Sequence, residues 1–213
     1  MGFKMRGLFK TTNRHRKYWK NRKIDWATAY GNFDHPHRQL IVNALQQFLP
    51  FRSVLELGCA SGANLVRIKQ AYPFSDVGGL DWNADAIETA KKFLPQAGVL
   101  QVGEATDVYI SSGGADVVLT DMCYIYLGPK DFLQAIREAR RVARKGVIFC
   151  EFHEPKWWKR VAIKWTAGYN AHDYRKSLEK IGFHDINIVK LTPQDWPETE
   201  KENGLRAIIT ARP

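Results

Sequence analysis

The stretch SVLELGCASGAN (residues 53–64) predicts a strand, a tight loop and a helix in direct succession. The apolar run through Leu57 is typical of a buried strand, and the small residues after it are typical of a turn. Leu65 and Ile68 then continue with helical spacing. Glycine lets backbone approach a ligand closely, and the free N–H groups of a helix start face that ligand. The stretch therefore predicts a ligand-binding loop at the end of a buried strand.

The next apolar run, Val77–Leu80, ends in Asp81, 23 residues after Gly58. An acid at the tip of a second strand suits the two hydroxyls of a ribose. Ala60 stands where dinucleotide sites of the G-x-G-x-x-G type place the glycine that meets a pyrophosphate. Glu56 would repel a pyrophosphate but could attract an ammonium group. These residues favour a nucleoside ligand over a dinucleotide.

With these two motifs the sequence resembles the class I S-adenosylmethionine (SAM) methyltransferases. Their first motif reads hydrophobic-hydrophobic-(Asp/Glu)-x-Gly-x-(Gly/Ala)-x-Gly, which residues 54–62 match. The resemblance covers roughly residues 35–213 and implies SAM as the cofactor. It also implies an α/β fold, with a doubly wound, seven-stranded, mostly parallel sheet, helices on both faces and an antiparallel last strand. The alternation of strand and helix patterns through residue 150 independently predicts a doubly wound parallel sheet.

The resemblance also implies which residues bind the cofactor. Asp81 would accept hydrogen bonds from both ribose hydroxyls, and Trp82 would stack on the adenine. Glu104 would accept from the adenine amino group, with Glu in place of the usual Asp. Arg38, in a segment with Trp26 and Tyr30 that often covers the SAM carboxylate, could pair with that carboxylate. The full predicted set is Arg38, Glu56, Gly58, Cys59, Ala60, Gly62, Asp81, Trp82, Asn83, Glu104, Ala105, Asp121 and Met122.

A general base would help methyl transfer to a hydroxyl or a protonated amine. His153 is the first candidate, because it directly follows the fifth predicted strand and ligands sit at the carboxyl ends of such strands. A loop histidine without a catalytic role is the competing interpretation. Glu151 and Tyr126 are the alternative bases. His153 and Glu154 lack a third partner for a metal site, so no metal is expected.

The net charge of +10 is concentrated in residues 1–23, which contain nine Lys or Arg and no acid. We therefore expect a basic N-terminal arm over 1–23 and a nearly neutral methyltransferase domain over 24–213. The arm could bind nucleic acid or an anionic membrane, or remain a solvated tail. Three cysteines without paired spacing and the lack of any run of 18 apolar residues favour a cytoplasmic protein with no transmembrane segment.

The sequence thus predicts a methyltransferase that acts on an oxygen or nitrogen of a small metabolite or sugar. An RNA-modifying enzyme is the first alternative, in which the arm and the Trp-rich segment KWWKR (residues 156–160) grip the phosphate backbone. The stretch after the fourth strand, TDMCYIY (residues 120–126), lacks the Pro-Pro pair often found in enzymes that methylate an exocyclic amine of a base. The second alternative is a SAM-binding module without activity.

Overall fold

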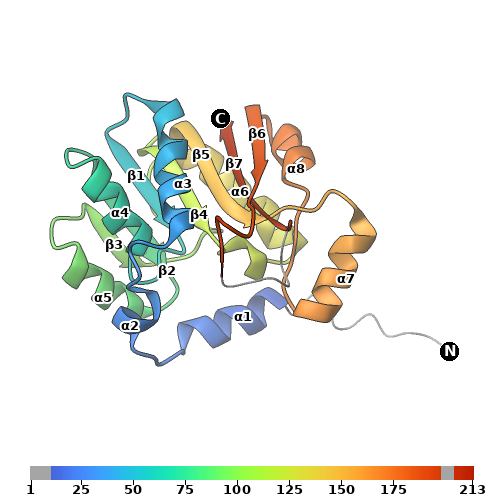
Figure 1. Ribbon diagram of the computed structural model, residues 1–213, viewed down its shortest axis with the longest axis horizontal. Coiled ribbons are helices and arrows are strands. Elements are labelled where there is room, and N and C mark those ends of the chain that lie inside the picture. Colours follow the sequence, from blue (N-terminus) through green and yellow to red (C-terminus); the bar gives the residue numbers. More distant parts are fainter. Residues whose placement is uncertain (1–10, 198–203) are drawn as a thin grey trace.

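The computed structural model describes residues 11–197 and 204–213. A seven-stranded sheet forms its centre, with strand order β3-β2-β1-β4-β5-β7-β6 (Figure 1). The strands are β1 (Ser53–Leu57), β2 (Asp76–Asp81), β3 (Val99–Val102), β4 (Ala115–Asp121), β5 (Ala143–Phe152), β6 (His184–Lys190) and β7 (Arg206–Arg212). The strands β1 to β5 pair in parallel, and β7 pairs antiparallel with both β5 and β6. The predicted fold class is confirmed, including the antiparallel last strand.

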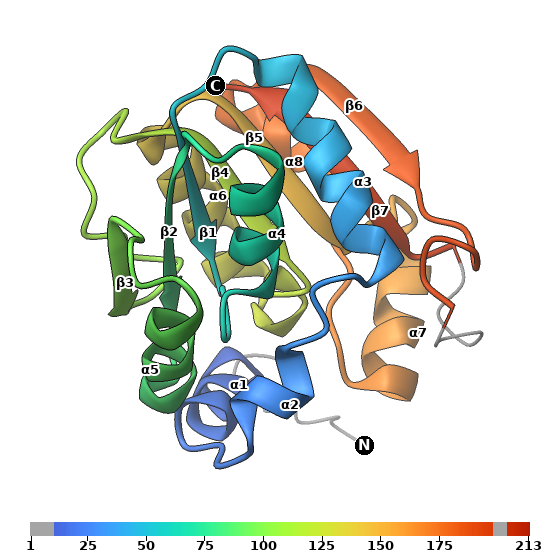
Figure 2. The same cartoon turned by 60° about the vertical axis from the view of Figure 1, so that its left-hand side comes forward.

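Helices cover both faces of the sheet (Figure 2). On one face lie α3 (Pro36–Leu45), α4 (Ala63–Ala71) and α5 (Ala84–Phe93), and on the other lie α6 (Pro129–Val142) and α8 (Tyr174–Ile181). Each face has its own apolar cluster, because β1, β4 and β5 bury side chains on both sides. Such continuous burial is what parallel strands between two helical layers require. The sheet therefore holds the carboxyl ends of its strands in fixed positions.

Residues 11–22, part of the predicted arm, pack on the domain. Here α1 (Thr11–Lys20) leads to α2 (Trp26–Tyr30) across the carboxyl ends of the central strands (Figure 2). The backbone N–H of Gly128 donates to Thr12 Oγ1 at 2.8 Å. The Asn83 amide donates to the carbonyls of Trp19 and Arg22 at 2.7 and 2.9 Å. These residues are therefore not a solvated tail, while residues 1–10 lie outside the described part.

The segment between β5 and α8, where the sequence pattern loosens, contains the helix α7 (Trp157–Ala167). No residue of α7 is fully buried, although Ile163 packs in part against an apolar cluster, so the helix has no core periodicity to detect. Two short 3-10 helices, η1 (Gln46–Phe48) and η2 (Tyr124–Tyr126), complete the described elements. Within residues 11–197 and 204–213, no helix is long and apolar enough to cross a membrane.

Candidate active site

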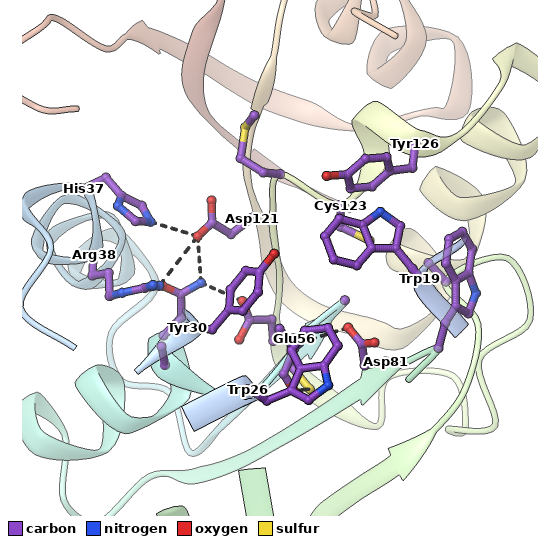
Figure 3. Close-up of a pocket in the computed structure, with 18 of the residues that line it drawn as sticks. Trp19, Trp26, Tyr30, His37, Arg38, Glu56, Asp81, Asp121, Cys123 and Tyr126 are labelled. Carbon is purple, nitrogen blue, oxygen red and sulfur yellow. Dashed lines mark hydrogen bonds and ion pairs between the residues drawn. The ribbon is translucent and has the colours of Figure 1, made fainter. Parts of the chain in front are cut away.

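A pocket opens at the carboxyl ends of β1, β2 and β4, where the predicted loops meet (Figure 3). Most of the predicted cofactor residues line it: Arg38, Glu56, Gly58, Cys59, Ala60, Asp81, Trp82, Ala105, Asp121 and Met122. Three predicted residues do not: Gly62, Asn83 and Glu104. The loops come together here because the sheet order places β1 between β2 and β4. Ligands of open α/β sheets bind at this kind of position.

The glycine-rich loop after β1 has the left-handed backbone that its sequence suggests. Gly58 and Gly62 have φ of +81° and +83°, and Ala60 between them has φ of +46°. The N–H groups of Gly58 and Cys59 both donate to the carbonyl of Leu80, at 2.7 and 3.0 Å. These bonds tie the loop to the end of β2. Gly62 itself caps α4 instead of lining the pocket.

Asp81 joins the glycine-rich loop to the start of α5. One carboxylate oxygen accepts from the Ala60 N–H at 2.9 Å, and the other accepts from the Asn83 N–H at 2.8 Å. Burial raises the pKa of Asp81, and these backbone N–H groups partly offset the effect. The side chain of Asn83 accepts a hydrogen bond from Ala86 N and so caps α5, which fixes the position of the Asn83 backbone beside Asp81. The structure thus places Asn83 under the site and not in its lining.

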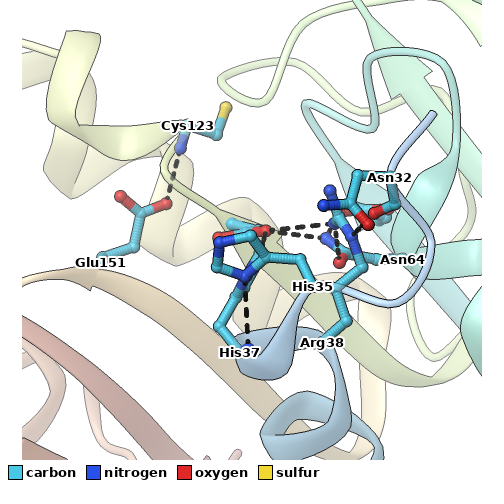
Figure 4. A network of polar contacts seen from close by, with 9 residues as sticks. Asn32, His35, His37, Arg38, Asn64, Cys123 and Glu151 are labelled. Carbon is cyan, nitrogen blue, oxygen red and sulfur yellow. Dashed lines mark hydrogen bonds and ion pairs between the residues drawn. The ribbon is translucent and has the colours of Figure 1, made fainter. Parts of the chain in front are cut away.

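Glu56 and Asp121 form an acidic floor bridged by Asn64 (Figures 3 and 4). The Asn64 amide donates to Glu56 Oε1 at 2.6 Å and to Asp121 Oδ2 at 3.0 Å. Burial raises the pKa of Glu56 to about 8, against the hydrogen bond from Asn64. Each carboxyl group keeps one buried oxygen, Glu56 Oε2 and Asp121 Oδ1, without a hydrogen-bond partner. The floor therefore has acceptors left for a ligand that carries donors or positive charge.

Hydrogen bonds and a nearby guanidinium hold Asp121 ionised. His37 Nε2 lies 2.9 Å from Asp121 Oδ2, and Arg38 Nη1 lies 3.8 Å from it. Burial alone would raise the pKa of Asp121, but its contacts with His37, Arg38 and Asn64 hold it well below its usual range. Arg38 also donates to the side chain of Asn64 and to the carbonyl of Asn32. Its guanidinium is therefore already engaged at the floor of the pocket (Figure 4).

Aromatic side chains form the opposite wall of the pocket (Figure 3). Trp26 and Tyr30 of α2 stack with ring centres 5.3 Å apart, and Trp19 of α1 lies 5.3 Å from Tyr126. All four side chains line the pocket. Trp26 and Tyr30 lie where the resemblance implied a cover, but Trp19 was assigned to the arm. Nothing in its local sequence, which is basic and without acids, indicates this packing.

Glu104 pairs with Arg16 of α1 instead of lining the pocket. The other lining residues that were not predicted include His37, Asn64 and Trp196. Asn64 belongs to the stretch quoted first, and His37 precedes Arg38 directly, so both could have been suspected. Trp196 lies in the loop before residues 198–203, and no motif marks it.

Of the three candidate bases, the structure brings only Tyr126 to the pocket. Burial raises the pKa of Tyr126 well above its usual value. Glu151 is fully buried, and its Oε1 accepts from Thr120 Oγ1, Cys123 N and Tyr124 N. It therefore fixes the loop after β4 (Figure 4).

His153 does not line the pocket. It is buried, its Nδ1 accepts from the N–H of Tyr174 at 3.3 Å, and burial lowers its pKa. The reason is the sheet order, since β5 lies beyond β4 and its end is covered by the start of α8.

The two buried glutamates give stability a pH dependence. Burial raises the pKa of Glu56 and of Glu151 from 4.5 to about 8. Each carboxyl thus contributes stability that is full below its unfolded pKa and is lost as the pH rises through 8. His172 has the opposite effect on stability. Burial lowers its pKa to about 3, so its contribution to stability is lost only as the pH falls below its unfolded pKa of 6.5. Between pH 6.5 and 8 His172 therefore does not contribute to the change, and the buried carboxyl groups with raised pKa lower the stability.

We expect the free energy of unfolding of the cofactor-free protein to fall between pH 6.5 and 8. The slope should reach at most about 1.4 kcal/mol per pH unit for each glutamate. Urea unfolding at several pH values measures it. The Glu151→Gln variant keeps an acceptor oxygen for the loop after β4 and should show about half the slope. Stability that rises across this window would contradict the raised pKa values.

Comparison with known proteins begins with a family model described as a methyltransferase domain, which matches residues 54–146. The matched region runs from the glycine-rich loop to the start of the apolar part of β5, and it includes most of the pocket loops. A search of curated proteins found no match. Within the described residues, no group of three or more His, Cys, Asp or Glu side chains is placed to hold a metal ion.

Several solved structures share the fold. Geranyl diphosphate C-methyltransferase from Streptomyces coelicolor A3(2) is 14% identical with a TM-score of 0.66, over 95% of this chain and 97% of that one. A possible histamine N-methyltransferase from Thermotoga maritima is 17% identical with a TM-score of 0.63, over 88% and 96%. The S-adenosylmethionine-dependent methyltransferase SibL is 18% identical with a TM-score of 0.61, but the chain spans only 55% of its length. At these identities the likeness shows the fold alone.

Proposed function

We propose that this chain, an S-adenosylmethionine-dependent methyltransferase with a class I fold, methylates an oxygen or nitrogen of a small metabolite or sugar. Its cofactor is SAM, which supplies an electrophilic methyl group on a sulfonium. The observation that carries the proposal is the pocket itself, with an acidic floor and aromatic walls that include Trp19 of α1. A pocket lined in this way suits a small acceptor.

The residues of the pocket fit the cofactor. Two orphaned carboxylate oxygens, Glu56 Oε2 and Asp121 Oδ1, are acceptors for positive or donor groups, and SAM carries an ammonium and a sulfonium. Glu56 would hold the ammonium, and Asp81 would hold the ribose hydroxyls. Trp82 would stack on the adenine, as the resemblance implies. Arg38 would reach the SAM carboxylate only by giving up part of its present contacts.

The acceptor would bind between Tyr126, His37 and Trp196. Trp196 stacks on His37 with ring centres 4.0 Å apart, and all three side chains line the pocket. The raised pKa of Tyr126 keeps its hydroxyl protonated, so that it would donate a hydrogen bond to the acceptor instead of removing a proton. Positioning the acceptor in line with the methyl group is then the main contribution of the protein.

The related folds support a small acceptor. One of them is a geranyl diphosphate C-methyltransferase, and another is a possible histamine N-methyltransferase. The positive charge of the arm is weak support for an RNA substrate, because Arg16 and Lys23 pair with Glu104 and Asp85 of the domain. A cytoplasmic location stays a prediction from the sequence.

The deciding experiment is incubation of the protein with methyl-labelled SAM and cell extract separated into small-molecule, RNA and protein fractions. We expect label in a small molecule and none with the Asp81→Ala variant, which should bind SAM poorly. Label in RNA would contradict the proposal and indicate an RNA-modifying enzyme instead. SAM binding measured by calorimetry, without transfer to any fraction, would instead indicate a non-catalytic module.

The packing of α1 gives a separate prediction. Replacing Trp19 with alanine removes an aromatic wall of the pocket and should weaken SAM binding by about tenfold, or 1.4 kcal/mol. Lys17→Ala is the matched control, because Lys17 is an exposed residue of the same helix and does not line the pocket. Calorimetric titration of both variants with SAM measures the difference. Equal affinities would mean that α1 merely lies near the pocket.

A further inference from the structure

The outer face of α7 carries an exposed aromatic stripe. Its members are Trp157, Trp158, Val161 and Trp165, which are 66%, 52%, 46% and 81% exposed. At about 100° of rotation per helical residue, these four side chains fall within about 100° of the helix circumference. Lone exposed aromatics are ordinary, but three tryptophans on one side of one short helix form a continuous apolar surface.

The rest of the helix fixes this stripe toward the outside. Ile163 packs against the small apolar cluster that contains Phe152. Arg160 donates to the carbonyls of Glu154 and Pro155 at 3.0 and 2.7 Å, and the Lys164 ammonium donates to Asn170 at 2.8 Å. In Figures 1 and 2, α7 stands at the edge of the molecule, and in Figure 1 its end lies near the end of α1.

Positive charge surrounds the stripe. Residues 155–169 contain four Lys or Arg and no acid, and Lys156 and Lys159 are exposed. Lys159 has only a loose contact with Glu154, at 3.9 Å. At the other end of α7, His15 of α1 hydrogen-bonds the backbone of Gly168, so the acid-free helix α1 borders the same region. A partner that covers the stripe must therefore tolerate or complement positive charge.

We propose that α7 docks the protein on the surface of an anionic phospholipid bilayer. Indole rings settle at the depth of the lipid headgroups, and lysines beside them pair with anionic lipid. A second copy of the chain would bring two basic helices together, which electrostatic repulsion opposes. Single-stranded RNA would bind by stacking its bases on the indoles. Val161, in the middle of the stripe, offers no surface for such stacking but suits contact with acyl chains, which favours the bilayer.

This docking would set the pocket close to the membrane. Tyr169 lies two residues after the end of the helix, and its ring lies 5.8 Å from that of Tyr126, which lines the pocket. The inference does not depend on which acceptor is methylated, and so its test is separate from that of the proposed function.

The test is flotation of the full-length protein with vesicles of phosphatidylcholine alone or mixed with phosphatidylglycerol. We expect binding to the anionic vesicles that falls with added salt, and little binding to the neutral ones. The variant Trp157→Ala/Trp158→Ala/Trp165→Ala should lose at least about tenfold in partitioning. Its melting temperature and SAM affinity should not change, because α7 has no buried residue.

The matched control is Phe74→Ala/Tyr109→Ala, which removes two aromatic side chains that are 100% and 81% exposed outside α7. It should bind anionic vesicles as the natural protein does. The proposal is overturned if the natural protein does not bind, or if the triple variant binds equally well. It is also overturned if the three tryptophans are needed for the binding of single-stranded RNA and not for the binding of vesicles.

Discussion

Replacing Gly58 with valine should abolish SAM binding. Gly58 has φ of +81°, a conformation that strains any β-branched residue. A Cβ atom at this position would also lie only 2.7 Å from the Cβ of Cys123, and its Sγ would be still closer. The strain and the overlap together should cost about 2–6 kcal/mol. The glycine-rich loop must shift to relieve the strain and the overlap, and SAM would then lose its contacts with the backbone of this loop.

Calorimetric titration with SAM measures this effect, and thermal unfolding shows whether the variant still folds. Gly98→Val is the matched control, because a Cβ at Gly98 meets nothing within 4 Å and its φ is not in the left-handed region. The control should bind SAM with nearly natural affinity. A Gly58→Val protein that binds SAM normally would show that the cofactor does not lie against this loop.

Replacing Asp81 with alanine should weaken SAM binding by about 2–4 kcal/mol, which is roughly 30-fold to 900-fold. The contacts to two ribose hydroxyls account for this range. The structure adds a second reason, since Asp81 also holds the N–H groups of Ala60 and Asn83. Those two donors would be left without their partner, and the glycine-rich loop would be less well fixed.

Two further variants separate the roles of the carboxylate. Asp81→Asn keeps one acceptor oxygen and should lose less affinity than Asp81→Ala. Glu104→Ala should have a small effect on SAM binding, because Glu104 pairs with Arg16 and does not line the pocket. Unchanged SAM affinity of Asp81→Ala in calorimetry would remove Asp81 from the site.

Sequence reasoning was most accurate for features set by neighbouring residues. The strand, the glycine-rich loop and the start of its helix occupy twelve consecutive positions, and each small or apolar residue there has a local reason. The acid at the end of β2 follows from the same kind of pattern. Once β1, β2 and β4 are parallel neighbours, their carboxyl ends must meet, and so most of the predicted lining residues come together.

The tertiary structure alone decided which outer segments reach the pocket. The basic sequence of α1 suggests a solvated arm, but Trp19 is held by the amide of Asn83 and the ring of Tyr126, both far away in sequence. His153 has the right place along the chain, yet α8 covers the end of β5 beside it. Long-range packing of this kind leaves no periodic trace in the sequence. The fold and the cofactor loop were therefore determined locally, whereas the walls of the pocket were determined by how distant segments pack.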